Sequence, residues 1–571
     1  MSLNFDPLSR GSIAIRKAII ALSISAAITA AAVYLLSPSF ATDPHLWPSI
    51  IMASLGYTAQ ALTWFFDHPS WGAFMSLDFA PLIHGVAMAI SAVVTMMCGI
   101  RVWISISDRK EYGESEYAKW ADIKRLQVTG KFGPVLGKFG SRLLMPTGPR
   151  STLVLAPTRG GKTRGIVIPT ILTYPGSKVI IDPKRELIEK TAEAERRSGR
   201  AVHIIDWTDP QSPSGWNPLG LDLPTNEVGL ERAIDRMAAM VYPASGSGDS
   251  HWKDTARRNF AALAIFQVLE GRRVSVQPKV ADVYSIIAAC AQENPTSDDD
   301  GDPVAENLKA LAKQAIINSY PGRVSDDLLL FANTHYRERS SHISTLLTGL
   351  QVWRSAAVAA VTSHSSFTWS ELRQRPTTIY IAFPQADAKA FGPLTAIFLE
   401  SLFAWGIDTP QGKKEQPILI IGEEFASLPE IPLLFDALAK GNGMGLHLMV
   451  VLQEIAQFEA IYKQTGVSQL TTNCSSIIAF NTVNRQTQEM LTKLVGNTTR
   501  ERKTKSRNAN QLFAGNANYS KESVPLIRTE QWGAIPFGNH MLLVQPDFTR
   551  PIFCKTPFWD KQRAMRRKMA A

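Results

Sequence analysis

A glycine-rich turn that ends in a lysine and a threonine is the clearest chemical feature of the sequence. It follows an aliphatic and β-branched run, residues 151–155, and closes with Gly160-Gly161-Lys162-Thr163. Glycines let backbone N–H groups approach phosphate oxygens, and the start of a helix adds a favourable dipole. The pattern predicts a P-loop, in which Lys162 reaches the β- and γ-phosphates of ATP and the Thr163 hydroxyl ligates Mg²⁺. The residues predicted to bind nucleotide are Ala156, Pro157, Thr158, Arg159, Gly160, Gly161, Lys162 and Thr163.

Two adjacent carboxylates, Glu423 and Glu424, supply the acidic partner that a P-loop needs on a neighbouring strand. They follow a buried aliphatic run, residues 418–421. In open α/β sheets, ligands bind at the carboxyl ends of the strands. We assign Glu423 to Mg²⁺, through water, and Glu424 to polarising the attacking water. The competing interpretation is a pair of solvated glutamates stabilised by the dipole of a helix start.

A polar amide, Gln453, ends a third buried run, residues 446–452. In RecA-like ATPases a polar side chain at this point often contacts the γ-phosphate or the attacking water. The simpler interpretation is a cap on the end of the strand. With Lys162 and Glu424, Gln453 completes the predicted catalytic set.

The elements that must position these residues are short apolar runs separated by longer helical patterns. This order predicts an α/β fold with a mostly parallel sheet and crossover helices. The runs stop between residues 217 and 371, where helical periodicity predicts an all-α insertion. A turn-rich acidic stretch within it, residues 293–303, is predicted to be an exposed loop. The predicted strands are residues 151–155, 178–181, 201–205, 377–383, 418–421, 446–452, 475–480 and 541–544.

Two long apolar segments predict a transmembrane region at residues 1–110. Residues 18–36 and 79–100 are each close to the roughly 20 residues that cross a bilayer. The loop between them, residues 37–78, contains no Lys or Arg, so the positive-inside rule places it in the periplasm and both long ends in the cytoplasm. A third uncharged stretch, residues 46–66, would give three spans and contradict that charge pattern. A cleaved signal peptide is the alternative for the first segment.

Composition sets outer bounds on the class of protein. The chain has 571 residues, of which 45% are hydrophobic and 19% charged, and this excludes wholesale disorder. Its net charge of +10 favours acidic partners such as nucleic acid or anionic lipid, although an ordinary basic enzyme has the same balance. The 4 cysteines have no paired spacing, so they predict neither a disulfide framework nor a zinc site.

Two basic clusters remain. Residues 500–507 run into Gly- and Asn-rich sequence, which predicts a mobile loop, and residues 561–568 lie in a basic C-terminal tail, 556–571. Either cluster can contact DNA phosphates or anionic lipid without reading sequence. A solvated charged surface is the alternative for each, and no interleaved aromatic residues suggest base stacking.

With these residues in hand, the chain resembles the type IV secretion system coupling proteins, the TraG-like ATPases of conjugation systems. The resemblance spans about residues 140–550. Two residues depart from the family pattern, since Glu423 stands where Asp is usual and Pro429 where Gly is usual. The segments that carry the resemblance are residues 156–163, 181–187, 206–210, 216–219 and 423–428, and the strand that ends in Gln453.

The resemblance implies a RecA-like P-loop ATPase in the bacterial inner membrane, with its ATPase domain in the cytoplasm. Its expected function is to recruit DNA–protein or protein substrates and to drive them into a type IV secretion channel by ATP hydrolysis. The expected domains are the two-span transmembrane region at residues 1–110, a nucleotide-binding domain in two parts at 111–220 and 371–555, an all-α domain at 221–370, and the tail.

The resemblance also implies partners. We expect a homo-hexamer with ATP sites at subunit boundaries, inner-membrane secretion components, and a relaxase, relaxosome or effector protein as cargo. DNA would be held by non-specific phosphate contacts, and the lipid bilayer would hold the anchor. A lone P-loop domain usually lacks an arginine that a neighbouring subunit donates. The candidates for that arginine are Arg354, Arg375, Arg485 and Arg528.

Two other functions stay open. One is a membrane-anchored pump of the FtsK type that translocates duplex DNA without a secretion partner. The other is a docking platform that binds nucleotide for stability and does not hydrolyse it, an interpretation that Glu423 and Glu424 argue against.

Overall fold

The computed structural model describes residues 113–570 apart from 132, 149, 244–249, 296–300 and 507–515. The predicted spans at residues 18–36 and 79–100 and the loop between them lie outside the described residues. Within the described part, one helix, Gln385–Asp408, is long and apolar enough to cross a membrane, but 67% of its apolar window is buried in the protein. Burial of this kind is typical of a core helix.

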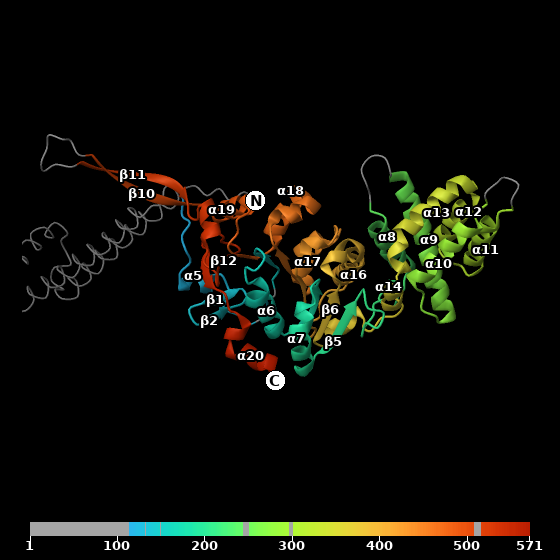
Figure 1. Cartoon of the computed structure of the whole chain (residues 1–571), viewed down its shortest axis with the longest axis horizontal. Coiled ribbons are helices and arrows are strands. Elements are labelled where there is room, and N and C mark those ends of the chain that lie inside the picture. The colour runs from blue at the N-terminus through green and yellow to red at the C-terminus, as the bar shows by residue number, and fades with distance from the viewer. Residues whose placement is uncertain are drawn as a thin grey trace, which may run out of the picture. The chain divides into compact units, whose positions relative to one another are not determined.

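The described residues form strands in two sheets. A hairpin of β10 and β11 stands alone, and the other strands form one 11-stranded sheet (Figure 1). The strands are β1 (Gly137–Phe139), β2 (Arg142–Leu144), β3 (Thr152–Leu155), β4 (Ser177–Asp182), β5 (Ala201–Asp206), β6 (Thr377–Ala382), β7 (Ile418–Gly422), β8 (Leu446–Leu452), β9 (Ser476–Ala479), β10 (Asn497–Ser506), β11 (Asn516–Pro525), β12 (Asn539–Val544) and β13 (Ile552–Lys555).

The large sheet is mostly parallel, as predicted. Its order is β2-β1-β13-β12-β9-β3-β8-β7-β4-β6-β5. From β9 to β5 every neighbouring pair is parallel, and the pairs from β2 to β9 are antiparallel. All eight predicted apolar runs form strands of this sheet. The sequence did not reveal β1, β2 and β13, because they have three or four residues each and mix polar with apolar side chains.

Helices cover both faces of the sheet, and each face has its own hydrophobic core. Successive side chains of a strand point to opposite faces, so Leu153 and Leu155 belong to one core and Val154 to the other. The Val154 core includes residues of α5 (Trp120–Arg125), α6 (Ile168–Thr173), α7 (Glu186–Arg197) and α20 (Arg563–Ala570). The Leu153 core includes residues of α16 (Ala388–Asp408), α17 (Leu434–Met444), α18 (Ile455–Asn473) and α19 (Arg485–Val495).

Between β5 and β6 the described residues form helices and no strand. Figure 1 shows α8–α14 gathered in a group of their own. Helical periodicity in the sequence predicts that Trp252, Ala256, Phe260 and Leu263 share one apolar face of a helix. Ala256, Phe260 and Leu263 are indeed buried, whereas Trp252 is 37% exposed. The helices are α8 (Glu227–Val241), α9 (Ser250–Val274), α10 (Val280–Glu293), α11 (Pro303–Ile317), α12 (Gly322–Asn333), α13 (Tyr336–Leu350), α14 (Ala356–Val361) and α15 (Trp369–Gln374).

The first basic cluster is a strand, so its prediction as a loop was wrong. Residues 500–506 lie in β10, which pairs along its whole length with β11. Water can solvate Lys and Arg side chains on a strand as well as on a loop, and the threonines among them favour a strand. Arg500 and Arg502 are exposed, as their charge indicates, but charge did not indicate the backbone conformation of the segment.

The second basic cluster is also more ordered than a tail. Residues 563–570 form α20, which packs beside α6 and α7. Met565 is buried under this helix, and the Lys568 ammonium donates a hydrogen bond to the Leu172 carbonyl at 2.7 Å. Arg563, Arg566 and Arg567 stay exposed on its outer side.

A buried histidine makes the stability of the sheet sensitive to acid. His540 on β12 donates through Nε2 to the Leu136 carbonyl at 2.8 Å and accepts at Nδ1 from the Thr556 hydroxyl at 3.0 Å. Burial lowers the pKa of His540 from 6.5 to about 4, so between these values the unfolded chain binds a proton that the folded chain excludes. The free energy of unfolding should therefore fall as pH drops from about 6.5 to 4, by up to about 3 kcal/mol. Urea unfolding of the wild type and His540→Gln at pH 7 and 4.5 checks this, and an equal drop in both proteins would contradict it.

Candidate functional site

The predicted P-loop joins β3 to a helix that begins with a π-helical turn, η3 (Thr163–Val167). Arg159 and Gly161 have φ angles of 61° and 91°, so the backbone turns sharply at both residues. A Cβ on Gly160 would lie 3.0 Å from the Pro157 carbonyl oxygen, which leaves little room for a side chain. The first N–H groups of a helix have no acceptor within it and can bind an anion. The loop is therefore shaped as a phosphate site.

Lys162 and Thr163 lie against Glu423. The Thr163 hydroxyl donates a hydrogen bond to Oε1 of Glu423, and both Lys162 and Glu423 are buried. Burial lowers the pKa of Lys162, while the charges of Glu423 and Glu424 oppose that shift. Burial raises the pKa of Glu423, and the Thr163 hydrogen bond and the Lys162 charge oppose it. The ammonium and the carboxylate thus stabilise each other in a buried site.

Glu424 ends a chain of polar contacts that starts in the P-loop. The Thr158 hydroxyl donates to Oε1 of Gln453 at 3.1 Å, and Nε2 of Gln453 donates to Oε1 of Glu424 at 3.2 Å. The same carboxylate oxygen forms an ion pair with Lys184. Oε2 of Glu424 is buried and has no hydrogen-bond partner among the residues that the structure describes. One carboxylate oxygen is therefore held in place, and the other has an unused capacity to accept a hydrogen bond.

These side chains come from the carboxyl ends of four parallel strands. The P-loop follows β3, Gln453 follows β8, the glutamates follow β7 and Lys184 follows β4. The expectation that the glutamates lie on the strand next to the P-loop strand was wrong, because β8 lies between β3 and β7. Chain order does not determine strand order in a parallel sheet. Because β8 lies between β3 and β7, Gln453 at its end contacts both the P-loop and Glu424.

Two residues at the end of β4, Asp182 and Lys184, had no role assigned from the sequence. Asp182 is fully buried, and this burial raises its pKa to about 7. The N–H of Ile188 donates a hydrogen bond to Oδ2 of Asp182 at 2.9 Å, and this bond partly opposes the upward shift. Burial lowers the pKa of Lys184, but the hydrogen bond and charge of Glu424 outweigh it, so the net shift is upward. Both residues follow a predicted strand, and the rule that carboxyl ends of parallel strands meet could have found them.

An aromatic pair beside the P-loop was also missed. The rings of Phe537 and Phe558 stack with centroids 5.6 Å apart, and a Cβ on Gly161 would lie 3.0 Å from the Phe558 ring. The Arg164 guanidinium lies 4.8 Å from the centre of the Phe558 ring and pairs with Asp560. Phe537 is 64% exposed, so this pair presents an apolar face next to the loop. No sequence pattern links these aromatics to a loop so distant along the chain.

The four arginines named as candidates for donation between subunits are all exposed. Arg375 and Arg485 form ion pairs with glutamates four residues away. Arg354 ends the short helix η4 (Gln351–Arg354), and Arg528 precedes η7 (Thr529–Ala534). An exposed arginine can reach the ATP site of a neighbouring chain, and all four candidates meet this condition equally.

The donor atoms of the site fit Mg²⁺. The Thr163 hydroxyl and the Glu423 carboxylate are hard oxygen ligands, the type that Mg²⁺ prefers. They already contact each other, so a small ion between them would replace an existing hydrogen bond. The buried, unpartnered Oε2 of Glu424 adds an acceptor for a water molecule nearby. The residues present are therefore compatible with a magnesium–nucleotide complex.

Comparisons with known proteins agree on one family. A family model described as type IV secretory system conjugative DNA transfer matches residues 108–570. Protein VirD4 of Agrobacterium fabrum (strain C58 / ATCC 33970) is 26% identical over 477 residues, which are 81% of this chain and 68% of that protein. Conjugal transfer protein TraG of Escherichia coli is 26% identical over 469 residues, 73% of this chain and 71% of that protein.

The fold has solved counterparts. The plasmid coupling protein TrwB in complex with ADP and Mg²⁺ superimposes with a TM-score of 0.55 at 18% identity, over 80% of this chain and 99% of that chain. TrwBdeltaN70 in complex with sulphate superimposes with a TM-score of 0.56, over 79% of this chain and 95% of that chain. The RecA-like fold expected from the sequence is confirmed by these likenesses. Because the family model covers most of the chain, the protein belongs to the type IV secretory system conjugative DNA transfer family.

Proposed function

We propose that the protein is a membrane-anchored ATPase that couples ATP hydrolysis to the transfer of DNA–protein or protein substrates through a type IV secretion channel. One observation carries the proposal: Thr163 contacts Glu423 and Gln453 contacts Glu424 at the ends of the three consecutive strands β3, β8 and β7, beside a loop shaped for phosphates. Membership of the conjugative DNA transfer family supports the transport role. TrwB, whose fold this chain shares, has been solved with ADP and Mg²⁺ and with a non-hydrolysable ATP analogue.

The binding half of the mechanism uses the P-loop. The N–H groups from Gly161 to Thr163 and the Lys162 ammonium hold the phosphates, while the Gly160 N–H donates to the Pro157 carbonyl and closes the turn. Lys162 stabilises charge that grows on the phosphates during bond cleavage. Thr163 and Glu423 are the residues that would hold Mg²⁺, which supplies neutralisation of phosphate charge. The Phe537 and Phe558 rings offer a face on which a nucleotide base can pack. Ala156 at the start of the loop is buried, and its N–H donates to the Leu452 carbonyl at 3.1 Å, which ties the loop to β8.

The hydrolytic half uses Glu424. Its Oε2 accepts a hydrogen bond from the attacking water and takes the proton as the water attacks. Gln453 and Lys184 hold Oε1, which fixes the orientation of the carboxylate and keeps a positive charge beside it. Gln453 also contacts Thr158 of the P-loop, so it can report the state of the bound phosphate to Glu424. Lys184 is a positioning residue in this scheme.

Assembly completes the site. An arginine from a neighbouring subunit in a homo-hexamer would stabilise the transferring phosphate, and the exposed Arg354, Arg375, Arg485 and Arg528 are the candidates. The cargo is a relaxase-linked DNA strand, an effector protein or both, and the neighbours are inner-membrane components of the secretion system. The spans at residues 18–36 and 79–100 would anchor the ATPase domain on the cytoplasmic side of the inner membrane.

The exposed face of α20 is proposed to contact DNA phosphates. Substituting Arg563, Arg566 and Arg567 together by Gln leaves the buried Met565 in place, so the helix should persist. If each arginine neutralises one phosphate, the slope of log binding constant against log salt for duplex DNA should flatten by about 2–3. The matched control is the exposed pair Lys413 and Lys414 on the loop before β7, also changed to Gln. Equal slopes for the arginine variant and the wild type would remove this role.

Gene replacement tests the proposed function. Donor cells that lack the protein and carry the rest of its secretion system should transfer no substrate, and wild-type protein should restore transfer while Lys162→Ala should not. Transfer that persists without the protein would overturn the proposal. Two further outcomes identify the rivals: translocation along duplex DNA without any secretion partner indicates an FtsK-type pump, and full transfer with Lys162→Ala indicates a docking platform.

A further inference from the structure

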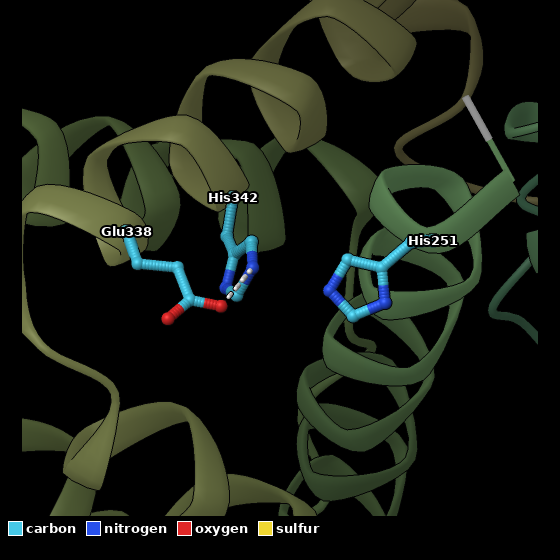
Figure 2. Close-up of side chains that lie close together, drawn as sticks. All are labelled: His251, Glu338 and His342. Atoms are coloured by element: carbon cyan, nitrogen blue, oxygen red, sulfur yellow. Dashed lines mark ion pairs between the residues drawn. The ribbon is translucent and has the colours of Figure 1, made fainter. Parts of the chain in front are cut away.

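Two histidines and a glutamate converge in the helical region between β5 and β6, away from the P-loop along the chain. His251 lies in the first turn of α9, and Glu338 and His342 lie one turn apart on the same face of α13. Figure 2 shows the side chains of the three residues turned toward one another. One ligand atom from each, a ring nitrogen or a carboxylate oxygen, lies within 4.8 Å of the other two.

The environment of His342 is an independent sign that a ligand belongs here. His342 is 3% exposed, and within the described residues neither of its ring nitrogens has a hydrogen-bond partner. Its Nε2 lies 3.6 Å from Oε1 of Glu338, and the Trp252 ring packs edge-on against its ring at 5.3 Å between centroids. Buried polar groups almost always have partners. A buried imidazole that faces a carboxylate and a second imidazole therefore has an unfilled bonding capacity.

The donor set selects a class of ion. Two imidazoles and one carboxylate suit Zn²⁺ and similar transition metals, whereas Mg²⁺ and Ca²⁺ prefer oxygen ligands alone. Tetrahedral bonds of roughly 2.0–2.2 Å place ligand atoms roughly 3.4 Å apart. The 3.6 Å between Nε2 of His342 and Oε1 of Glu338 is already close to that spacing. His251 is exposed, so its side chain can turn to close the remaining gap.

We propose that His251, Glu338 and His342 bind one Zn²⁺ ion, or a chemically similar divalent transition metal, that links the start of α9 to α13. A water molecule takes the fourth position on the exposed side, because His251 and Glu338 both face solvent. The ion would fix the first turn of α9 against α13. This site is distinct from the Mg²⁺ position at the P-loop, and the proposal does not depend on ATP hydrolysis.

Metal titration of the full chain tests the proposal. The protein is purified in detergent, freed of any histidine tag and of metal by a chelator, and titrated with Zn²⁺ by calorimetry without nucleotide. His251→Gln and Glu338→Gln are the test variants, because both residues are exposed and their loss should leave the fold intact. His364→Gln is the matched control, an exposed histidine outside the cluster.

The wild type and His364→Gln should each bind one Zn²⁺ per chain at this site. The two test variants should bind Zn²⁺ at least about 10–100-fold more weakly. Losing a residue that only hydrogen-bonds to a metal ligand lowers metal affinity by that factor, and losing the ligand itself should lower it at least as much. Co²⁺ should give the visible absorption of a tetrahedral site in the wild type and lose it in the test variants. Equal Zn²⁺ affinity in Glu338→Gln and the wild type, or the same Co²⁺ spectrum in both, would overturn the proposal.

Discussion

Lys162→Ala is expected to lower ATP turnover by at least about 10²–10³-fold while the chain stays folded. The ammonium is buried between the loop glycines and the two carboxylates, where water cannot replace its charge. Alanine removes that preorganised charge from the developing phosphate and also weakens nucleotide binding. Phosphate release by detergent-solubilised protein measures the turnover, and thermal unfolding checks that the variant remains folded.

The matched control is Lys190→Ala. Lys190 is an exposed lysine on α7 whose ion pair with Glu186 four residues away is worth only about 0.3–0.5 kcal/mol. Its loss should leave turnover unchanged. Wild-type turnover in Lys162→Ala would show that this lysine does not act on the phosphates, and it would contradict the assignment of the loop as the ATP site.

Glu424→Gln is expected to preserve ATP binding and to lower the rate of hydrolysis by about 10²–10⁴-fold. The amide has nearly the shape of the carboxylate, so packing around it should be kept, but it cannot take a proton from water at Oε2. It also cannot pair with the Lys184 ammonium as a carboxylate does. Single-turnover hydrolysis, measured beside equilibrium binding of a fluorescent ATP analogue, separates the two effects.

Glu430→Gln serves as the control for this change, since Glu430 is an exposed glutamate a few residues further along the chain. It should hydrolyse ATP at the wild-type rate. Loss of ATP binding in Glu424→Gln would assign this residue to the metal, and an unchanged rate would leave hydrolysis without its proposed base.

The buried parallel strands could be predicted because strands covered on both faces are continuous apolar runs. Residues 446–452 illustrate this, since every residue of β8 is buried. The position of β8 between the P-loop strand and the Glu424 strand could not be predicted, because neighbour relations in a parallel sheet arise from crossovers. The same limit hid Lys184, which meets Glu424 only because β4 lies beside β7.

The charge patterns of the sequence predicted which segments are exposed better than they predicted the secondary structure of those segments. Arg500 and Arg502 of β10 and the three arginines of α20 are exposed, as their charge indicates, yet the two segments form a strand and a helix. The cluster of His251, Glu338 and His342 shows a similar limit. The spacing of Glu338 and His342 along α13 is visible in the sequence, but His251 reaches them only through the packing of α9 against α13.

The central claim is that the triphosphate of ATP binds between the P-loop and the carboxylates that follow β7. A structure of the full chain with Mg²⁺ and a non-hydrolysable ATP analogue tests this most directly. We predict that the phosphates will lie on the N–H groups of Gly161 to Thr163, with the Thr163 hydroxyl turned from Glu423 to the metal and a water molecule at Oε2 of Glu424. Phosphates bound away from the loop, or a Glu424 side chain turned away from them, would contradict the account.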